Sequence, residues 1–125
     1  MAEELNREGI ADLAARAGEG TPVVMLNLLA FDGEAGRESY ARYGEAVAPL
    51  LAGVGGELLY AGEPATPAIG EQRWDLVLLV RYPTRQAFLD MVGSPEYAEI
   101  SHLRTEALKR SELHPLDTLQ DGALA

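Results

Sequence analysis

Residues 23–31 (VVMLNLLAF) are apolar at odd and even positions alike, with Asn27 as the one exception. Successive side chains of a β-strand point to opposite faces of the sheet, so a strand of this composition must be covered on both faces. Residues 74–82 contain a second stretch that is apolar on both faces in its middle. The two segments therefore predict the central strands of one sheet.

Helical stretches alternate with these strands. The apolar periodicity of an α-helix occurs in residues 3–17, 39–54 and 84–110. Within the last of these, Gly93-Ser94-Pro95-Glu96 has the form of a new helix start, because serine caps helices and proline suits their first turn. This region therefore predicts a split helix. Pro49 lies inside the second helix and predicts a kink or a break there, because it lacks the N–H that a helix needs.

Two shorter strands complete the pattern. Residues 57–63 and 113–119 are predicted strands, residues 32–36 are a predicted loop, and Pro115 confines the last strand to a sheet edge or a bulge. Setting the first helix aside, the element order is that of an α+β ferredoxin-like fold, an antiparallel sheet with its helices on one face. We expect an N-terminal helical extension over residues 1–21, a ferredoxin-like domain over 22–119 and a loose tail over 120–125.

The second face of this sheet needs a cover that the two helices of the domain do not supply. A large apolar patch in water is rare on stable monomers, and two copies packed face to face would hide it. The alternative is that the N-terminal helix folds over that face, although its four apolar stripe residues would cover only part of it. We therefore expect a homodimer formed through sheet faces.

Composition narrows the classes of function. The chain has 125 residues, the size of one domain, and a net charge of −10, which disfavours nucleic acid as a partner. It contains no cysteine, which excludes disulfides and a cysteine nucleophile and fits a reducing compartment. Its start lacks the pattern of a signal peptide, and its longest apolar run is too short to span a bilayer. We expect a cytoplasmic protein without a membrane partner.

Motifs for cofactors and metals are missing from the sequence. There is no phosphate-binding loop and no dinucleotide fingerprint, and two histidines exclude a three-histidine zinc site. Glu99, His102 and Glu106 share one face of a predicted helix, but this spacing is equally typical of a solvated polar face, and one helix supplies too few metal ligands. We therefore expect no cofactor and no metal.

Several short motifs follow one another in a recognisable order. They are residues 22–29 (PVVMLNLL), Tyr40-x-x-Tyr43-Gly44, Gly55-Gly56, Trp74-Asp75, Val80-Arg81-Tyr82-Pro83, Phe88-Leu89-x-Met91, Ser94-Pro95-Glu96-Tyr97 and Arg104. Together they resemble the domain-of-unknown-function family numbered 1330, within the dimeric α+β barrel superfamily. The resemblance covers residues 22–119 and implies a ferredoxin-like fold, a dimer through sheet faces and no established reaction. In one departure, many relatives carry a histidine directly before the arginine that matches Arg104, whereas here that place is Leu103 and the histidine is His102.

Five residues are candidates for a ligand site. They are Asn27, Tyr43, Trp74, Arg81 and Arg104. Asn27 interrupts an apolar strand, so its amide either bonds to a neighbour or faces a polar cavity. Arg81 ends the other central strand, where it either extends to solvent or reaches the same face and binds a carboxylate. Arg104 falls on the apolar stripe of the last helix and is a candidate for a buried ion pair or an anion contact.

The aromatic candidates have a weaker claim. Tyr43 lies on an apolar helix stripe and Trp74 opens a strand, and such residues belong to the core more often than to a site, although either can form an edge of a cavity. The sequence predicts a dimer that binds a small apolar or carboxylate-bearing molecule. Two alternatives stay open, namely a cofactor-independent enzyme such as a monooxygenase or isomerase, by analogy with other dimeric α+β barrels, and a structural or interaction module without a ligand.

Overall fold

Four strands form one antiparallel sheet in the computed structural model, which describes residues 5–119. The strands are β1 (Val23–Phe31), β2 (Glu57–Gly62), β3 (Leu76–Tyr82) and β4 (Leu108–Leu116), in the spatial order β2-β3-β1-β4. The helices are α1 (Arg7–Ala15), α2 (Gly33–Gly53), α3 (Arg85–Val92) and α4 (Pro95–Ala107). This confirms the predicted α+β ferredoxin-like arrangement, with β1 and β3 in the centre. The tail predicted for residues 120–125 lies outside the described residues.

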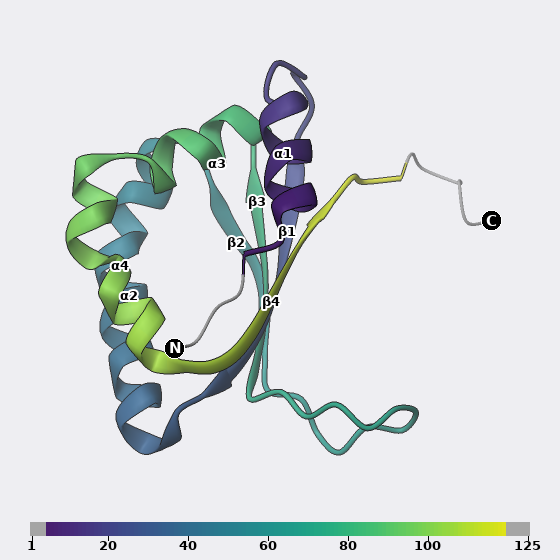
Figure 1. The fold of residues 1–125 in the computed structure, drawn as a ribbon, viewed down its shortest axis with the longest axis vertical. Helices are drawn as coiled ribbons and strands as arrows, with labels where there is room; N and C mark the ends of the chain where they lie inside the picture. The colour runs from purple at the N-terminus through teal and green to yellow at the C-terminus, as the bar shows by residue number, and fades with distance from the viewer. Residues whose placement is uncertain (1–4, 120–125) are drawn as a thin grey trace.

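Helices α2, α3 and α4 gather on one side of the sheet, where α2 and α4 lie side by side (Figure 1). Odd-numbered residues of β1 point to this side, and Val23, Met25 and Leu29 are each no more than 1% exposed there. Directly opposite residues of paired strands share a face. Leu78, which pairs with Asn27, therefore also faces the helices, whereas Leu79, which pairs with Leu26, points to the other side.

Side-chain caps mark three helix starts. The side chains of Asn6, Thr84 and Ser94 accept hydrogen bonds from backbone N–H groups in the first turns of α1, α3 and α4. The caps satisfy donors that the helix itself leaves without partners. The prediction that Ser94 begins a new helix, with Pro95 in its first position, is confirmed.

The start of α2 differs from the prediction. The helix begins at Gly33, so the loop predicted for residues 32–36 is wrong. Gly36 does not form a loop but allows close packing. A Cβ on Gly36 would lie 2.4 Å from the carbonyl oxygen of Ala107, at the end of α4. The break predicted at Pro49 is also wrong, because α2 continues through it to Gly53.

The last strand begins earlier than predicted. β4 starts at Leu108, in a region predicted to be helical to residue 110, and pairs with β1 along its whole length. Hydrogen bonding to a central strand thus overrides the helical propensity of Lys109 and Arg110. Pro115 lies opposite Met25 on the outermost strand, which confirms its predicted edge position.

The N-terminal helix packs on the same side as the other helices. Leu13 of α1 is 4% exposed and belongs to a cluster with Val23, Met25 and Met91. The alternative in which this helix folds over the second face is therefore wrong, and no described helix covers that face. None of the helices within residues 5–119 is long and apolar enough to cross a membrane.

Candidate functional site

A cavity of about 210 Å³ lies between the sheet and helices α2 and α4. Its walls are mainly apolar, and β1, β2, β3, α2, α3 and α4 all contribute to them. The aliphatic and thioether side chains are Val47, Leu51, Leu58, Leu78, Val80 and Met91. The other large side chains are Asn27, Tyr40, Tyr43, Tyr82 and Arg104. The structure thus brings three of the five predicted site residues, Asn27, Tyr43 and Arg104, to one cavity.

Asn27 supplies an amide to the cavity floor. It lies in the middle of β1, is 8% exposed, and points to the helix side because of its odd position. Its Nδ2 atom donates a hydrogen bond of 3.3 Å to the carbonyl oxygen of Met25. Both readings of Asn27 made from the sequence, a bonded amide and a cavity-lining amide, therefore describe the same side chain.

Two tyrosines connect the helices above the cavity. The hydroxyl oxygens of Tyr43 on α2 and Tyr97 on α4 lie 2.8 Å apart, within hydrogen-bond distance. Burial raises the pKa of both hydroxyls above the ordinary tyrosine value, and the mutual contact further raises that of Tyr43. Both groups therefore remain protonated near neutral pH and can donate hydrogen bonds, but they do not act as bases.

Arg104 brings a positive charge to the cavity wall. Its position on α4 removes much of the guanidinium from water, and this burial lowers its pKa to about 10. The group nevertheless keeps its charge at neutral pH. Arg104 also lines a second, more open groove between α1 and β4, so it stands between the inner cavity and that groove. An anion in the cavity would be attracted to it.

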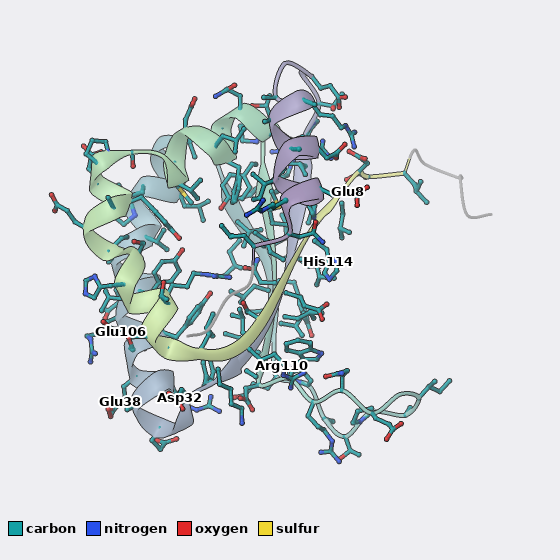
Figure 2. The ribbon with its side chains drawn as sticks, viewed as in Figure 1. Glu8, Asp32, Glu38, Glu106, Arg110 and His114 are labelled. Carbon is teal, nitrogen blue, oxygen red and sulfur yellow. The ribbon has the colours of Figure 1, made fainter. Side chains whose placement is uncertain are left out.

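Arg81 and Trp74 do not join this site. Arg81 pairs with Val24, so it points to the face away from Asn27, and its guanidinium lies 3.8 Å from the carboxylate of Glu57. Of the two alternatives that the sequence left open for Arg81, the one in which it reaches the face of Asn27 is therefore wrong. The Trp74 ring lies under the guanidinium of Arg110, 4.1 Å from the ring centroid. Figure 2 shows Arg110 on the side of the sheet away from α2 and α4.

Sequence reasoning missed several of the lining residues. Tyr82 is 5% exposed and lies two positions after Val80, so the alternation of β3 alone would have placed it on the cavity side. Tyr40 entered the sequence analysis only as part of a family motif, and it contacts Tyr43 with ring centroids 5.3 Å apart. Gly44 and Ala48 carried no signal, because small residues on a helix indicate a cavity only when their surroundings are known.

The described residues hold no group of three or more histidine, cysteine, aspartate or glutamate side chains placed to bind a metal ion. The cavity lining within residues 5–119 also contains no histidine, cysteine, lysine or carboxylate. Its polar groups are thus an amide, tyrosine hydroxyls and one guanidinium. None of these exchanges a proton readily near neutral pH, so the arrangement suits binding better than acid–base chemistry by the protein.

Comparison with known proteins gives a family match and a set of similar folds. Residues 35–113 match the family described as domain of unknown function DUF1330. A crystallised protein of unknown function from Rhodopseudomonas palustris is 32% identical, with a TM-score of 0.86 over 94% of this chain and 96% of that one. No curated protein matches the chain.

More distant structures share the fold alone. A dimeric ferredoxin-like protein of unknown function from Bacteroides fragilis is 13% identical, with a TM-score of 0.56 over 78% of this chain and 96% of that one. A putative antibiotic biosynthesis monooxygenase from Bacteroides thetaiotaomicron is 18% identical, with a TM-score of 0.58 over 82% and 93% of the two chains.

Proposed function

We propose a ligand-binding function for this chain, which belongs to the DUF1330 family, a family defined by a domain of unknown function. The ligand is a small, mainly apolar molecule with one anionic group, bound between the sheet and helices α2 and α4. The observation that carries the proposal is the cavity itself, where Asn27 and Arg104 interrupt apolar walls. A mostly apolar pocket with a few convergent polar groups is the usual form of a small-molecule site.

The size of the cavity restricts the ligand to a single ring or a short chain. An apolar protein cavity of about 150 Å³ holds benzene, and this one measures about 210 Å³. The space therefore suits a benzene ring with one small substituent. The charge of Arg104 favours a carboxylate or another planar anion, because a guanidinium binds these through paired hydrogen bonds.

Benzoate and its neutral analogue benzamide test this proposal. We expect benzoate to raise the melting temperature of the protein, and benzamide to do so less. Arg104→Gln should abolish the difference between the two ligands. Arg81→Gln is the matched control, because Arg81 lies on the other face of the sheet, and it should leave the difference intact. The proposal would be contradicted if both variants lost the difference between the two ligands equally. It would also be contradicted if neither benzoate nor related ring carboxylates raised the melting temperature of the wild type.

An enzyme acting without a cofactor is the second candidate. It draws on the putative monooxygenase of similar fold, which is 18% identical to this chain. The lining residues also lack a group that transfers protons near neutral pH. Mass spectrometry of ligands after incubation with the protein would detect turnover. The third candidate, an interaction module, would be favoured if no ligand bound and substitution of Asn27 or Arg81 changed stability alone.

We further infer a homodimer formed through the uncovered sheet face. Leu26 and Leu79 pair directly at its centre, and β4 contributes polar groups that include His114 (Figure 2). The Bacteroides fragilis protein is dimeric, as is a ferredoxin-like protein of unknown function from Thermobifida fusca that is 12% identical to this chain, and both support the inference. A mass of two chains at micromolar concentration would agree with it.

A cysteine-free chain also agrees with a cytoplasmic location, and the charge of −10 makes nucleic acid an unsuitable partner.

A further inference from the structure

We infer that ligands enter the cavity through an opening between α2 and the edge strand β2, and that Gly44 and Ala48 determine which molecules fit through it. The inference rests on the proposed function and adds the route and the orientation of the ligand. It also names the residues that select for ligand size. Neither residue carries a polar side-chain group, so a substitution there leaves Asn27 and Arg104 in place.

The opening is visible in the exposure of residues that also line the cavity. Leu58 of β2 is 55% exposed, and Gly44 and Ala48 of α2 are exposed as well. A residue that touches both the cavity and the solvent marks the place where the two meet. Most of the other lining residues, by contrast, are buried or half-buried, including Asn27 and Tyr82.

The sequence of α2 explains why the opening lies here. Gly44 and Ala48 are four residues apart, so they stack on one face of the helix. A Cβ atom built on Gly44 would meet no other atom within 4 Å. The neighbouring positions Tyr40, Tyr43 and Val47 carry large side chains that fill the space beside it. Two small residues on successive turns of α2 thus leave a slot in an otherwise filled helix face.

The edge strand forms the opposite lip of the slot. Leu58 pairs with Val80, whereas Tyr60 pairs with Leu79, because a bulge at Leu59 shifts the register between them. A bulge re-aims the side chains on either side of it. Leu58 therefore faces the cavity and Tyr60 faces the other side of the sheet. Within residues 5–119 no further strand lies beyond β2, which leaves this edge of the slot open to solvent.

The cavity floor becomes polar with distance from the slot. It crosses from Leu58 on β2, over Val80 and Leu78 on β3, to Asn27 on β1. Neighbouring strands are about 4.8 Å apart, so the floor extends roughly 10 Å from its apolar lip to the amide. Arg104 of α4 lines the same cavity as Asn27. A ligand would thus place its anionic group inward and its apolar end at the slot.

The ligand class follows from this polarity. It is a ring carboxylate that carries an apolar substituent opposite the carboxylate, so that the ring occupies the cavity and the substituent reaches the slot. 4-Propylbenzoate has this form, and benzoate lacks the substituent. The ratio of their dissociation constants therefore reports on the slot, whereas binding of benzoate by itself reports on the proposed function.

Substitutions in the slot test the route. We expect Ala48→Leu to weaken binding of 4-propylbenzoate about tenfold or more and that of benzoate much less, measured by isothermal titration calorimetry. Ala41→Leu is the matched control, because Ala41 is exposed on α2 and does not line the cavity. Gly44→Ala narrows the slot by one methyl group and should have a smaller effect in the same direction. It should also raise the melting temperature, because alanine favours a helix more than glycine does.

The outcomes separate the two proposals. If the wild type binds both ligands and Ala48→Leu binds 4-propylbenzoate as tightly as Ala41→Leu does, the route is wrong and the proposed function stands. If the wild type binds neither ligand, the proposed function is wrong and the route falls with it. Should Ala48→Leu fail to fold, Gly44→Ala still decides, because an unchanged ratio of dissociation constants in a stabilised protein would refute the slot.

Discussion

The hydroxyl oxygens of Tyr43 on α2 and Tyr97 on α4 lie 2.8 Å apart, within hydrogen-bond distance, and join the two helices. Their rings meet edge to face, with centroids 6.2 Å apart. The two residues are 54 positions apart in the chain, so their contact arises from the fold and not from local structure. This bond forms part of the roof over the proposed ligand cavity.

Removal of this bond should cost stability without unfolding the protein. Tyr97→Phe leaves the buried hydroxyl of Tyr43 without this partner, which should lower the free energy of unfolding by about 1–2 kcal/mol. Tyr43→Phe should cost a similar amount. Because both changes remove the same bond, the double variant should cost less than the sum of the two, as measured by urea denaturation. Strict additivity would show that the two hydroxyls do not interact.

Gly36 and Gly44, both on α2, should respond in opposite ways to alanine. A Cβ on Gly36 would press against the backbone of Ala107, so we expect Gly36→Ala to lower the free energy of unfolding by about 1–3 kcal/mol. Gly44 faces open space, and Gly44→Ala should raise the free energy of unfolding by roughly 0.5–1 kcal/mol. Thermal and urea denaturation would check both values. Similar effects at the two positions would refute the close contact between the start of α2 and the end of α4.

Asn27→Leu should separate a structural role of the amide from a functional one. The amide is buried, and its hydrogen bond to the carbonyl oxygen of Met25 is long at 3.3 Å. A leucine has a similarly branched side chain and removes the cost of burying a polar group, so the free energy of unfolding should stay the same or rise. Affinity for benzoate, followed by calorimetry, should fall about tenfold. A large loss of stability with unchanged affinity would instead identify Asn27 as a structural amide.

Leu26→Lys should dissociate the proposed dimer. The side chain points to the uncovered face, where it lies opposite Leu79 of β3, so a lysine would place a charge at the centre of the contact. We expect single chains at micromolar concentration by light scattering, with a circular dichroism spectrum like that of the wild type. Ile69→Lys is the control, because Ile69 is 97% exposed in a loop and should leave the assembly unchanged. A Leu26→Lys variant of dimeric mass would show that this face is not the interface.

Acid should weaken the ion pairs that Arg16, at the end of α1, forms with Glu19 and Asp117. Hydrogen bonds from Arg16 lower the pKa of Glu19 and of Asp117 below their ordinary values, and Arg85 adds to both effects. A carboxyl whose pKa is lower in the folded state stabilises the protein above its unfolded pKa near 4, and this stabilisation is lost as the pH falls through the folded value. The effect is small, because both carboxylates face solvent.

Asp117→Asn provides the measurement for this acid response. The variant should be less stable than the wild type at about pH 7, and the difference between their urea midpoints should close as the pH falls toward about 3. Glu45→Gln, on the exposed face of α2, serves as the control and should show no such convergence. If the difference between the urea midpoints of Asp117→Asn and the wild type stayed constant with pH, the carboxylate charge of Asp117 would not contribute to stability.

The local parts of the fold were accessible from the sequence. Strand β1 has the bounds predicted from its apolar run, and Ser94 caps α4 as its neighbours indicated. The wrong predictions concern helix and strand boundaries that depend on contacts with residues distant in the sequence. The start of α2 depends on the approach of Gly36 to Ala107, and the start of β4 depends on pairing with β1. Neither contact can be predicted from the local hydrophobic periodicity of the sequence.

The sequence by itself determined that two strands are apolar on both faces and that a polar residue, Asn27, interrupts one of them. The tertiary structure decided which polar residues meet, because the register between strands assigns each side chain to a face, and a shift by one residue would reverse that assignment. The pairing of Arg81 with Val24 turns Arg81 away from Asn27, while α4 carries Arg104 to the same cavity. The proposed opening of the cavity depends on Gly44 and Ala48, whose small size matters only because α2 borders the cavity at these positions.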